Sequence, residues 1–366
     1  MMFTLQAESG KARFGILRTT HGKIETPFFM PVATKLAVKL INPHDLEELG
    51  LRSIIANAFI LYLNPGVKLI DKSGGVHEFM NYSGCIFTDS GGFQMVSDKF
   101  LVDINRKWVK FRSPFDQSLH MITPEKDIEI QNKLNSDIAM CLDYMPRSDD
   151  KYEDVKESVE ITYDWAKRCK QAHKNKKQLL FGIIQGGCFK DLRKKSSELI
   201  TSIGFDGYAI GGLGLGEGRE KMFKAVEMAI ANMPRDKPRY LMGIGTPQDL
   251  VKAVGMGVDI FDSCYVTKHS RHEMVFTQNG EIQIGKQKFK EDFSPLDEDC
   301  KCMVCENYTK AYIHHLLKIN ELSWKRLVTW HNLYFVNNLM VECRKAIKEN
   351  GFAGFEKGFL ERYKFK

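Results

Sequence analysis

Eight short apolar runs, each ending in a glycine or a polar residue, constrain the fold of this chain more than any other feature. They alternate with segments of helical periodicity, so each run predicts a buried strand followed by a helix. Such a pattern has two common solutions, a closed (β/α)8 barrel and an open doubly wound sheet. The number of runs favours the α/β barrel, and their shortness leaves the open sheet as the alternative. The expected strands are 26–32, 53–58, 85–89, 137–143, 179–185, 207–212, 239–243 and 258–262.

Three helical segments carry explicit start signals. In each, a capping Asn or Thr precedes a proline at the first helical position, and acidic residues follow. These pairs are Asn42-Pro43, Thr123-Pro124 and Thr246-Pro247, and the first helix is expected to end at Gly50. The N-terminal stretch 3–24 is expected to form a hairpin that turns near His21-Gly22.

Polar side chains and glycines stand at or just after the C-terminal ends of seven runs. In a barrel these ends meet at one mouth, which is where barrel enzymes keep their chemistry. Asp89 closes an apolar run, and Gly91-Gly92 let the backbone turn tightly after it. Taken alone, Asp89 could serve only to begin that turn. The residues at the strand ends are Asn57, Asp89, Asp143, Gln185, Gly212 with Leu213, Met242 with Gly243, and Asp262.

Two carboxylates at one mouth can share the work of glycosyl exchange. One attacks an anomeric carbon as nucleophile, and the other moves protons on the leaving and entering groups; Asp262 and Asp89 are the natural pair. A further set offers acceptor and donor edges that match a purine such as guanine. This set is the Asp143 carboxylate, the Gln185 amide and the backbone of Gly212 and Leu213. The glycine-rich segment 211–216 lacks the spacing of a dinucleotide site.

Three cysteines crowd into the segment 300–305, and a reducing compartment argues against disulfides as the reason. Three thiolates and one imidazole are the ligand set of a closed, structural zinc site, so we expect one Zn²⁺ per chain. The expected ligands are Cys300, Cys302, Cys305 and His331, with His314 and His315 as competing sources of the imidazole. We therefore expect residues 1–288 to form the barrel with its hairpin. Residues 289–366 are expected to form an appended zinc-binding subdomain and C-terminal helices packed on the barrel.

The composition limits the possible partners and the cellular location of the chain. The chain has 53 basic and 46 acidic residues, a net charge of +7 that tolerates an anionic polymer as partner. No apolar stretch approaches 18 residues, and the N-terminus lacks the order of a secretory signal. We expect a cytoplasmic protein that does not engage a membrane.

Several motifs together resemble the tRNA-guanine transglycosylases. The similarity runs from about residue 3 past His331, and the combination is specific although each motif alone is weak. The motifs are TDSGGFQ at 88–94, GIIQGG at 182–187, GFDGYAIGGL at 204–213, YLMGIG at 240–245, VDIFD at 258–262 and the Cys-x-Cys-x2-Cys…His set.

The resemblance implies a TIM barrel with a zinc subdomain, assembled as a homodimer. It implies exchange of guanine in a tRNA anticodon loop, at position 34 of queuosine-type anticodons, for a 7-deazaguanine base (preQ1, preQ0 or queuine). In the family's pattern Asp262 is the nucleophile that attacks C1′ and forms a covalent RNA intermediate, and Asp89 is the general acid/base. The purine-reading positions are Asp143, Gln185, Gly212 and Leu213; Phe93 and Met242 sandwich the base; and Asn57 and Gln94 are supporting polar positions. The target base has to leave its stack, which an unpaired loop permits.

Two regions depart from the family's pattern. After Asp262, where the pattern reads Cys-Val-x-Pro-Thr-Arg, Lys268 and Arg271 keep positive charge for RNA, but Lys lacks the planar fork of Arg. Tyr144-Met145 and Gly214-Leu215 replace the usual residues beside the 7-substituent of the base. Three alternatives stay open. They are the same exchange at another tRNA position or in DNA (archaeosine-like), a non-catalytic RNA-binding subunit, and a barrel glycosidase of small sugars. The presence of both acids disfavours the subunit.

Overall fold

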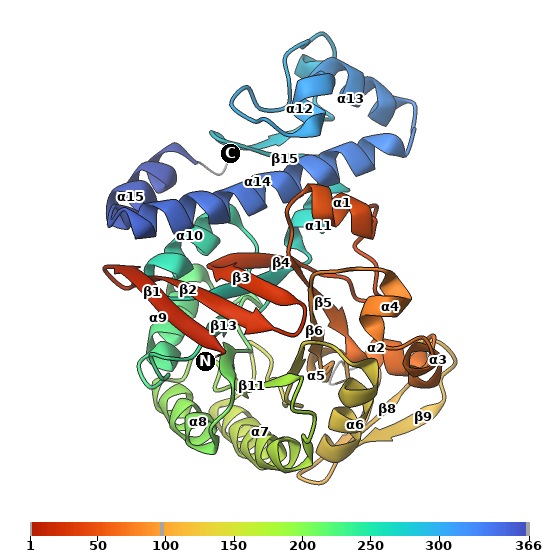
Figure 1. Cartoon of the computed structure of the whole chain (residues 1–366), viewed down its shortest axis with the longest axis vertical. Helices are drawn as coiled ribbons and strands as arrows, with labels where there is room; N and C mark the ends of the chain where they lie inside the picture. The colour runs from red at the N-terminus through yellow and green to blue at the C-terminus, as the bar shows by residue number, and fades with distance from the viewer. Residues whose placement is uncertain (1, 96–98, 364–366) are drawn as a thin grey trace.

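Eight parallel strands form a ring, which lies in the lower half of Figure 1, below the C-terminal helices. The structure is a computed structural model that describes residues 2–95 and 99–363, and of Phe93 the backbone alone. The strands follow the order β4-β14-β13-β12-β11-β10-β6-β5. A parallel bridge between Val32 and Ile55 joins the two ends of this order and closes the ring. The predicted (β/α)8 barrel is therefore confirmed, and the open sheet is excluded.

The barrel strands coincide with the eight predicted runs to within a few residues at each end. Their inward side chains form a compact apolar layer in which Phe87 packs edge-on against Phe181 and Tyr240, with ring centroids 5.9 and 6.0 Å apart. The strands are β4 (Phe28–Pro31), β5 (Ser53–Asn57), β6 (Cys85–Asp89), β10 (Ile138–Met140), β11 (Leu179–Ile184), β12 (Gly207–Ile210), β13 (Arg239–Leu241) and β14 (Ile260–Ser263).

The helices begin where the start signals predict. α1 (Pro43–Glu48), α6 (Pro124–Leu134) and α10 (Pro247–Gly255) each follow a residue whose side chain accepts a backbone N–H from the first turn. After α1 the chain reaches Gly50 with a positive φ of 67°. The other helices around the barrel are α2 (Ala58–Leu63), α3 (Val67–Lys72), α4 (Val76–Met80), α5 (Gly92–Met95), α7 (Tyr152–Ala172), α8 (Lys190–Ile203), α9 (Arg219–Ile230) and α11 (Tyr265–Ser270).

The N-terminal stretch forms three antiparallel strands instead of one hairpin. They are β1 (Phe3–Ser9), β2 (Ala12–Thr19) and β3 (Gly22–Thr26). The expected turn near His21 joins β2 to β3, and a second turn at Gly10, with φ of 60°, adds β1. Side chains of this sheet share a buried cluster with the barrel interior, so the sheet closes the N-terminal end of the barrel (Figure 1). A second antiparallel sheet, β7 (Leu101–Ile104), β8 (Val109–Arg112) and β9 (Leu119–Ile122), is inserted before α6.

The C-terminal segment packs on the barrel. Its long helix α14 (Ser323–Lys348) contacts β1, β2, β4, α10 and α11, and Figure 1 shows it between the barrel and the segment that carries α12 and α13. The remaining elements are β15 (Met274–Thr277), β16 (Gly280–Gln283), η1 (Gln287–Phe289), α12 (Met303–Asn307), α13 (Lys310–Lys318) and α15 (Phe352–Arg362). Within residues 2–95 and 99–363, we find no helix with the length and apolar character needed to cross a bilayer.

Candidate active site

The C-terminal ends of the barrel strands open into one cavity of about 420 Å³. Lys268 and Arg271 are not in its wall; they lie on α11 and at its end. The Phe93 side chain lies outside the described part of the structure. The remaining predicted residues of the site all line this cavity: Asn57, Asp89, Gln94, Asp143, Gln185, Gly212, Leu213, Met242 and Asp262.

Asp262, in β14, is held by one of its two carboxylate oxygens. The Tyr240 hydroxyl donates to Oδ1 at 2.5 Å, and the Gly243 N–H donates to the same oxygen at 3.0 Å. Oδ2 receives no hydrogen bond from a described residue. Burial raises the pKa of Asp262, and the two hydrogen bonds oppose that shift. One oxygen is thus fixed while the other stays available to react. Sequence reasoning missed Tyr240, because an inward Tyr in a barrel strand looks like core.

Asp89 stands at the end of β6, directly after a buried strand. Its Oδ2 accepts hydrogen bonds from Asn57 Nδ2 at 3.3 Å and from the Gly91 N–H at 3.2 Å. Asn57 also donates to Gln94 Oε1 at 3.0 Å, which ties the predicted supporting residues to the acid. Gly91 has a φ of 86°, and a Cβ there would lie 2.3 Å from the Cβ of Phe59. Only glycine allows this turn, which aims Asp89 at the cavity.

The environment of Asp89 suits proton transfer near neutral pH. Burial raises the pKa of Asp89 to about 7, and the charges of Asp143 and Asp262 contribute to the shift. Burial also raises the pKa of Asp143, to about 6, against the hydrogen bond from Gln185. A general acid/base works best when its pKa lies near the working pH. The cavity therefore holds a carboxyl group with a pKa suited to proton transfer and a second carboxylate with a free oxygen.

Replacing Asp89 with Asn is expected to stabilise the fold at alkaline pH. The pKa is about 7 in the folded chain and about 3.9 in an unfolded one, so the wild type loses stability as pH rises from about 4 to about 7. At pH 8 the neutral amide should make the variant more stable by about 1–3 kcal/mol. The gain should vanish near pH 4. Thermal unfolding at both pH values tests this, and an equal change at the two values would contradict it.

Asp143, Gln185 and Gly212 form one continuous edge of the cavity. Gln185 Nε2 donates to Asp143 Oδ2 at 2.5 Å, and Gln185 Oε1 is buried without a hydrogen bond from any described residue. A Cβ on Gly212, where φ is 67°, would lie 2.4 Å from Gln185 Oε1, so glycine is required there. A buried acceptor without a partner is costly. The edge therefore suits a ligand that brings N–H donors, as a purine does.

Two further residues shape this edge, and no sequence motif pointed to them. Arg193 is fully buried, and its Nη1 donates to the carbonyls of Ile184 and Gly211 at 2.9 and 3.0 Å. It thereby fixes the ends of β11 and β12 against each other. The Glu217 carboxylate accepts the N–H groups of residues 214–215 at 2.6 and 2.8 Å. It holds the glycine-rich loop that follows Leu213.

The predicted cysteine and histidine ligands meet outside the barrel. The ligand atoms of Cys300, Cys302, Cys305 and His331 all lie within 4.8 Å of one another. His331 Nε2 donates to the Phe276 carbonyl at 2.7 Å, so Nδ1 is left to face the three thiols at 3.3–3.8 Å. Such a backbone partner on the other nitrogen is typical of metal-binding histidines. The group could hold a metal ion. Of the three candidate histidines, His331 is the one that belongs to it.

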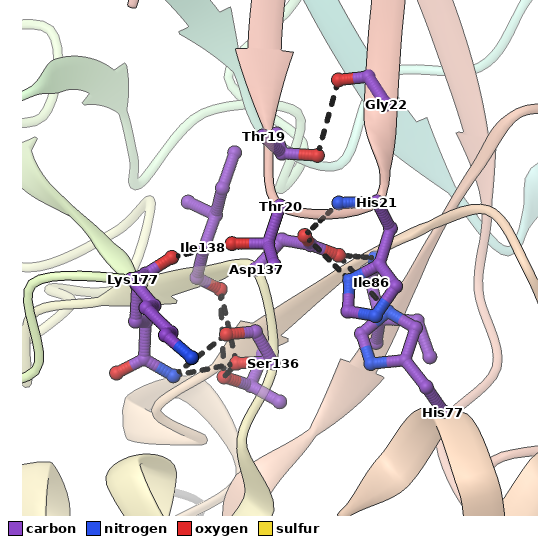
Figure 2. Close-up of polar contacts among 12 residues, drawn as sticks. Thr19, Thr20, His21, Gly22, His77, Ile86, Ser136, Asp137, Ile138 and Lys177 are labelled. Atoms are coloured by element: carbon purple, nitrogen blue, oxygen red, sulfur yellow. Dashed lines mark hydrogen bonds and ion pairs between the residues drawn. The ribbon is translucent and has the colours of Figure 1, made fainter.

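A second group, at the opposite end of the barrel, brings His21 and His77 to the buried carboxylate of Asp137 (Figure 2). Each ring nitrogen lies 2.9 Å from a different carboxylate oxygen, and the rings stack at 3.5 Å with a 15° interplanar angle. Because the rings are stacked, a metal ion bound about 2 Å from both nitrogens would lie far out of the plane of each ring, which disfavours a metal site here. The backbone N–H groups of His21 and Ile86 also donate to this carboxylate. The geometry is that of a hydrogen-bonded clamp between the β2–β3 turn, α4 and the start of β10.

Replacing Asp137 with Asn is expected to destabilise the fold by about 2–4 kcal/mol at pH 7, because the amide turns an N–H₂ group toward buried donors. Burial works against ionisation, yet hydrogen bonds from His77, Ile86 and His21 hold the pKa of Asp137 at about 2. Its stabilisation is therefore complete above the unfolded pKa of about 4 and is lost as pH falls toward 2. Urea unfolding at pH 7 and pH 2.5 should show a large difference between wild type and variant only at pH 7.

The fold and the site together define a barrel enzyme whose mouth combines two carboxylates with a polar edge that carries an unpaired acceptor. A family model described as queuine tRNA-ribosyltransferase matches residues 8–365. Relatives called queuine tRNA-ribosyltransferase include proteins of Halothermothrix orenii and Caldanaerobacter subterraneus, each 49% identical over 96% of this chain and over 95% and 94% of their own. A Fusobacterium nucleatum protein of that name is 46% identical over the whole chain and 98% of its own. This chain belongs to the queuine tRNA-ribosyltransferase family, the tRNA-guanine transglycosylases, and is a pentosyltransferase.

Proposed function

We propose that this protein exchanges guanine at position 34 of queuosine-type tRNA anticodons for a 7-deazaguanine base, through a covalent enzyme–RNA intermediate. The observation that carries the proposal is the single cavity that joins Asp262, with one free carboxylate oxygen, to Asp89 and to the edge of Asp143 and Gln185. The alternative of a non-catalytic subunit has no comparable support, because both acids are present and face one cavity.

In the proposed reaction Asp262 Oδ2 attacks C1′ of the target ribose while the C1′–N9 bond to guanine breaks. Tyr240 and Gly243 fix the other oxygen of this carboxylate. Protonated Asp89 gives a proton to the departing guanine. The incoming base then returns its N9 proton to Asp89, N9 attacks C1′, and the ester bond to Asp262 breaks. Two inversions at C1′ leave the ribose with its original configuration.

The polar edge of the cavity recognises the base. The Asp143 carboxylate and Gln185 Oε1 accept N–H groups of the purine, and the backbone of Gly212 and Leu213 supplies complementary groups. Met242 and Phe93 are proposed to sandwich the ring, and Met242 lies in the cavity wall. A flipped nucleotide can reach this edge because an anticodon loop leaves its bases unpaired.

The 7-substituent is proposed to lie beside Met145 and Leu215, which also line the cavity. The names of the relatives point to queuine, whereas preQ1 and preQ0 carry smaller substituents. Competition among the three bases for exchange against labelled guanine identifies the preferred one.

We propose that the Cys3His group holds one structural Zn²⁺ per chain. Soft thiolates with one imidazole suit zinc in a closed tetrahedral site, and no ligand position is left for a substrate. When bound, the ion ties the 300–305 segment to α14. This supports the division of the chain into a barrel of residues 1–288 and an appended zinc-binding part of residues 289–366.

We also propose that two copies assemble as a homodimer in the cytoplasm. The support is a group of exposed apolar side chains on α13 and just beyond it: Tyr312, Ile319 and Leu322, which are 46%, 57% and 65% exposed. Single exposed apolar residues are ordinary, but three within residues 312–322 favour a contact surface. Sedimentation of wild type and of Ile319→Glu with Leu322→Glu tests this assembly.

Incorporation of labelled guanine into tRNA with a queuosine-type anticodon tests the function. Exchange should occur at position 34, as mapped by mass spectrometry of nuclease fragments, and should cease when that guanine is replaced. Label at another tRNA position, or in DNA, would replace the proposed target while keeping the chemistry. Turnover of small glycosides without RNA would overturn the function.

A further inference from the structure

One aromatic side chain stands out from the zinc-binding part. Phe293 is 77% exposed, the highest value among the large apolar residues described. Its turn is fixed on both sides, because Asp292 Oδ1 accepts the N–H and hydroxyl of Ser294 at 3.0 and 2.6 Å. The first turn of α13 adds bonds from Lys310 Nζ to Ser294 Oγ at 2.8 Å and from the Ala311 N–H to the Asp292 carbonyl at 2.8 Å. An aromatic ring is thus held outward by a rigid support.

Three lysines lead up to this ring. Lys286, Lys288 and Lys290 are exposed, and none forms an ion pair with a described residue. Lys288 lies over the ring of the buried Phe289, 4.9 Å from its centroid. The nearby Asp292 is paired with Lys310 at 3.4 Å, so Glu291 is the one unpaired acid between residues 286 and 293. We call residues 286–293 the lysine–Phe293 strip; its exposed face carries a net positive charge.

The strip is connected to the active-site cavity through α11 and the β15–β16 hairpin. Cys264 lines the cavity, and α11 begins with the next residue. The β15–β16 hairpin follows α11, and the Ile284 N–H donates to the Glu273 carbonyl at 2.9 Å. The start of the strip therefore lies beside the end of α11, where Lys268 and Arg271 are found. Lys268, Arg271 and the three lysines of the strip lie along this connection, with the Glu273 carboxylate beside Gly285 between them.

We propose that the lysine–Phe293 strip binds the tRNA outside the exchanged nucleotide. The lysines contact phosphates, and Phe293 stacks on an unpaired base. This inference rests on the proposed function. Proteins that hold single-stranded RNA combine a basic track with aromatic platforms, and a rigid platform needs little ordering on binding. The unpaired lysines favour RNA over a second copy of the chain as occupant, because three like charges would oppose a protein contact unless acids met them.

The experiment compares tRNA affinity over a salt series for two variants with equal charge change. One is Lys286→Gln, Lys288→Gln and Lys290→Gln; the other is Lys174→Gln, Lys176→Gln and Lys177→Gln. The second trio is exposed and follows the C-terminus of α7, away from the cavity. Each lost phosphate contact lowers the slope of log Kd against log salt by about 0.7–0.9. We expect the first variant to lower it by about 2 and to bind tRNA at least 10-fold more weakly, with the second close to wild type.

Phe293 is tested by Phe293→Ala beside Phe293→Trp. Alanine should weaken tRNA binding by about 5- to 50-fold with little change in the salt slope, and tryptophan should restore the affinity. Equal loss in both lysine variants, or an Ala variant that changes sedimentation but not RNA affinity, would overturn the proposal. Guanine exchange by the wild-type protein is measured in parallel. If guanine exchange fails but the salt slope of tRNA binding still depends on the strip, the proposed function alone is refuted. If exchange occurs but the slope of the strip variant equals that of wild type, the proposal for the strip alone is refuted.

Discussion

Asp262→Asn should lose base exchange by at least about 10⁴-fold while the protein stays folded, because the amide cannot form the bond to C1′. The Asn side chain can still accept the hydrogen bonds of Tyr240 and Gly243, so the cavity should keep its shape. Single-turnover exchange of labelled guanine measures the loss, and thermal unfolding checks the fold. Substantial exchange by Asp262→Asn would remove Asp262 as the nucleophile.

Tyr240→Phe separates positioning from nucleophilic attack. The variant keeps the carboxylate but loses the 2.5 Å hydrogen bond to Oδ1, so we expect exchange to slow by about 10- to 100-fold without being abolished. Cys264→Ser is the matched control, since this exposed residue lines the same cavity and its side chain forms none of the hydrogen bonds to Asp262 or Asp89. An unchanged rate in Tyr240→Phe would mean that the hydrogen bond does not hold the reacting carboxylate.

Loss of a proposed metal ligand should have the largest effect on folding. Cys302 is 1% exposed and lies among the ligand atoms, so Cys302→Ser should lower the bound zinc from one equivalent to well below half and lower Tm by more than about 10 °C. The loss should spread to the barrel because α14, which carries His331, also packs on β1, β2 and β4.

Elemental analysis and calorimetry measure these effects. Cys264→Ser serves again as control, with full zinc and an unchanged Tm expected. Removal of the metal from wild type by a chelator should reproduce the Cys302→Ser result. Full stability without metal would show that the Cys3His group is an ordinary set of packed thiols.

Much of the barrel could be predicted from the sequence because short apolar runs and proline-led helix starts are local signals. Asn42, Thr123 and Thr246 mark helix starts whatever the rest of the chain does. The N-terminal sheet was harder, since the turn at Gly10 carries no proline or Asn-Gly pair to announce it. The alternation of strand and helix then places the strand ends at one mouth.

The contacts that tune the site could not be predicted in the same way. Tyr240 and Arg193 act through hydrogen bonds to groups brought near by the fold, and neither sits in a motif of polar residues. The clamp of Asp137 joins residues 21, 77 and 137, which only the closed barrel and its covering sheet bring together. The choice of His331 over His314 likewise depends on helix packing, because His314 Nδ1 lies against the Ile284 carbonyl instead.

One measurement tests the proposed chemistry most directly. The protein is incubated with tRNA in the absence of free base, the mixture is denatured, and the peptides are mapped. We predict an RNA–protein adduct that survives denaturation, maps to Asp262 and disappears when free guanine is added. An adduct on any other residue, or complete exchange without any bond between RNA and Asp262, would contradict it.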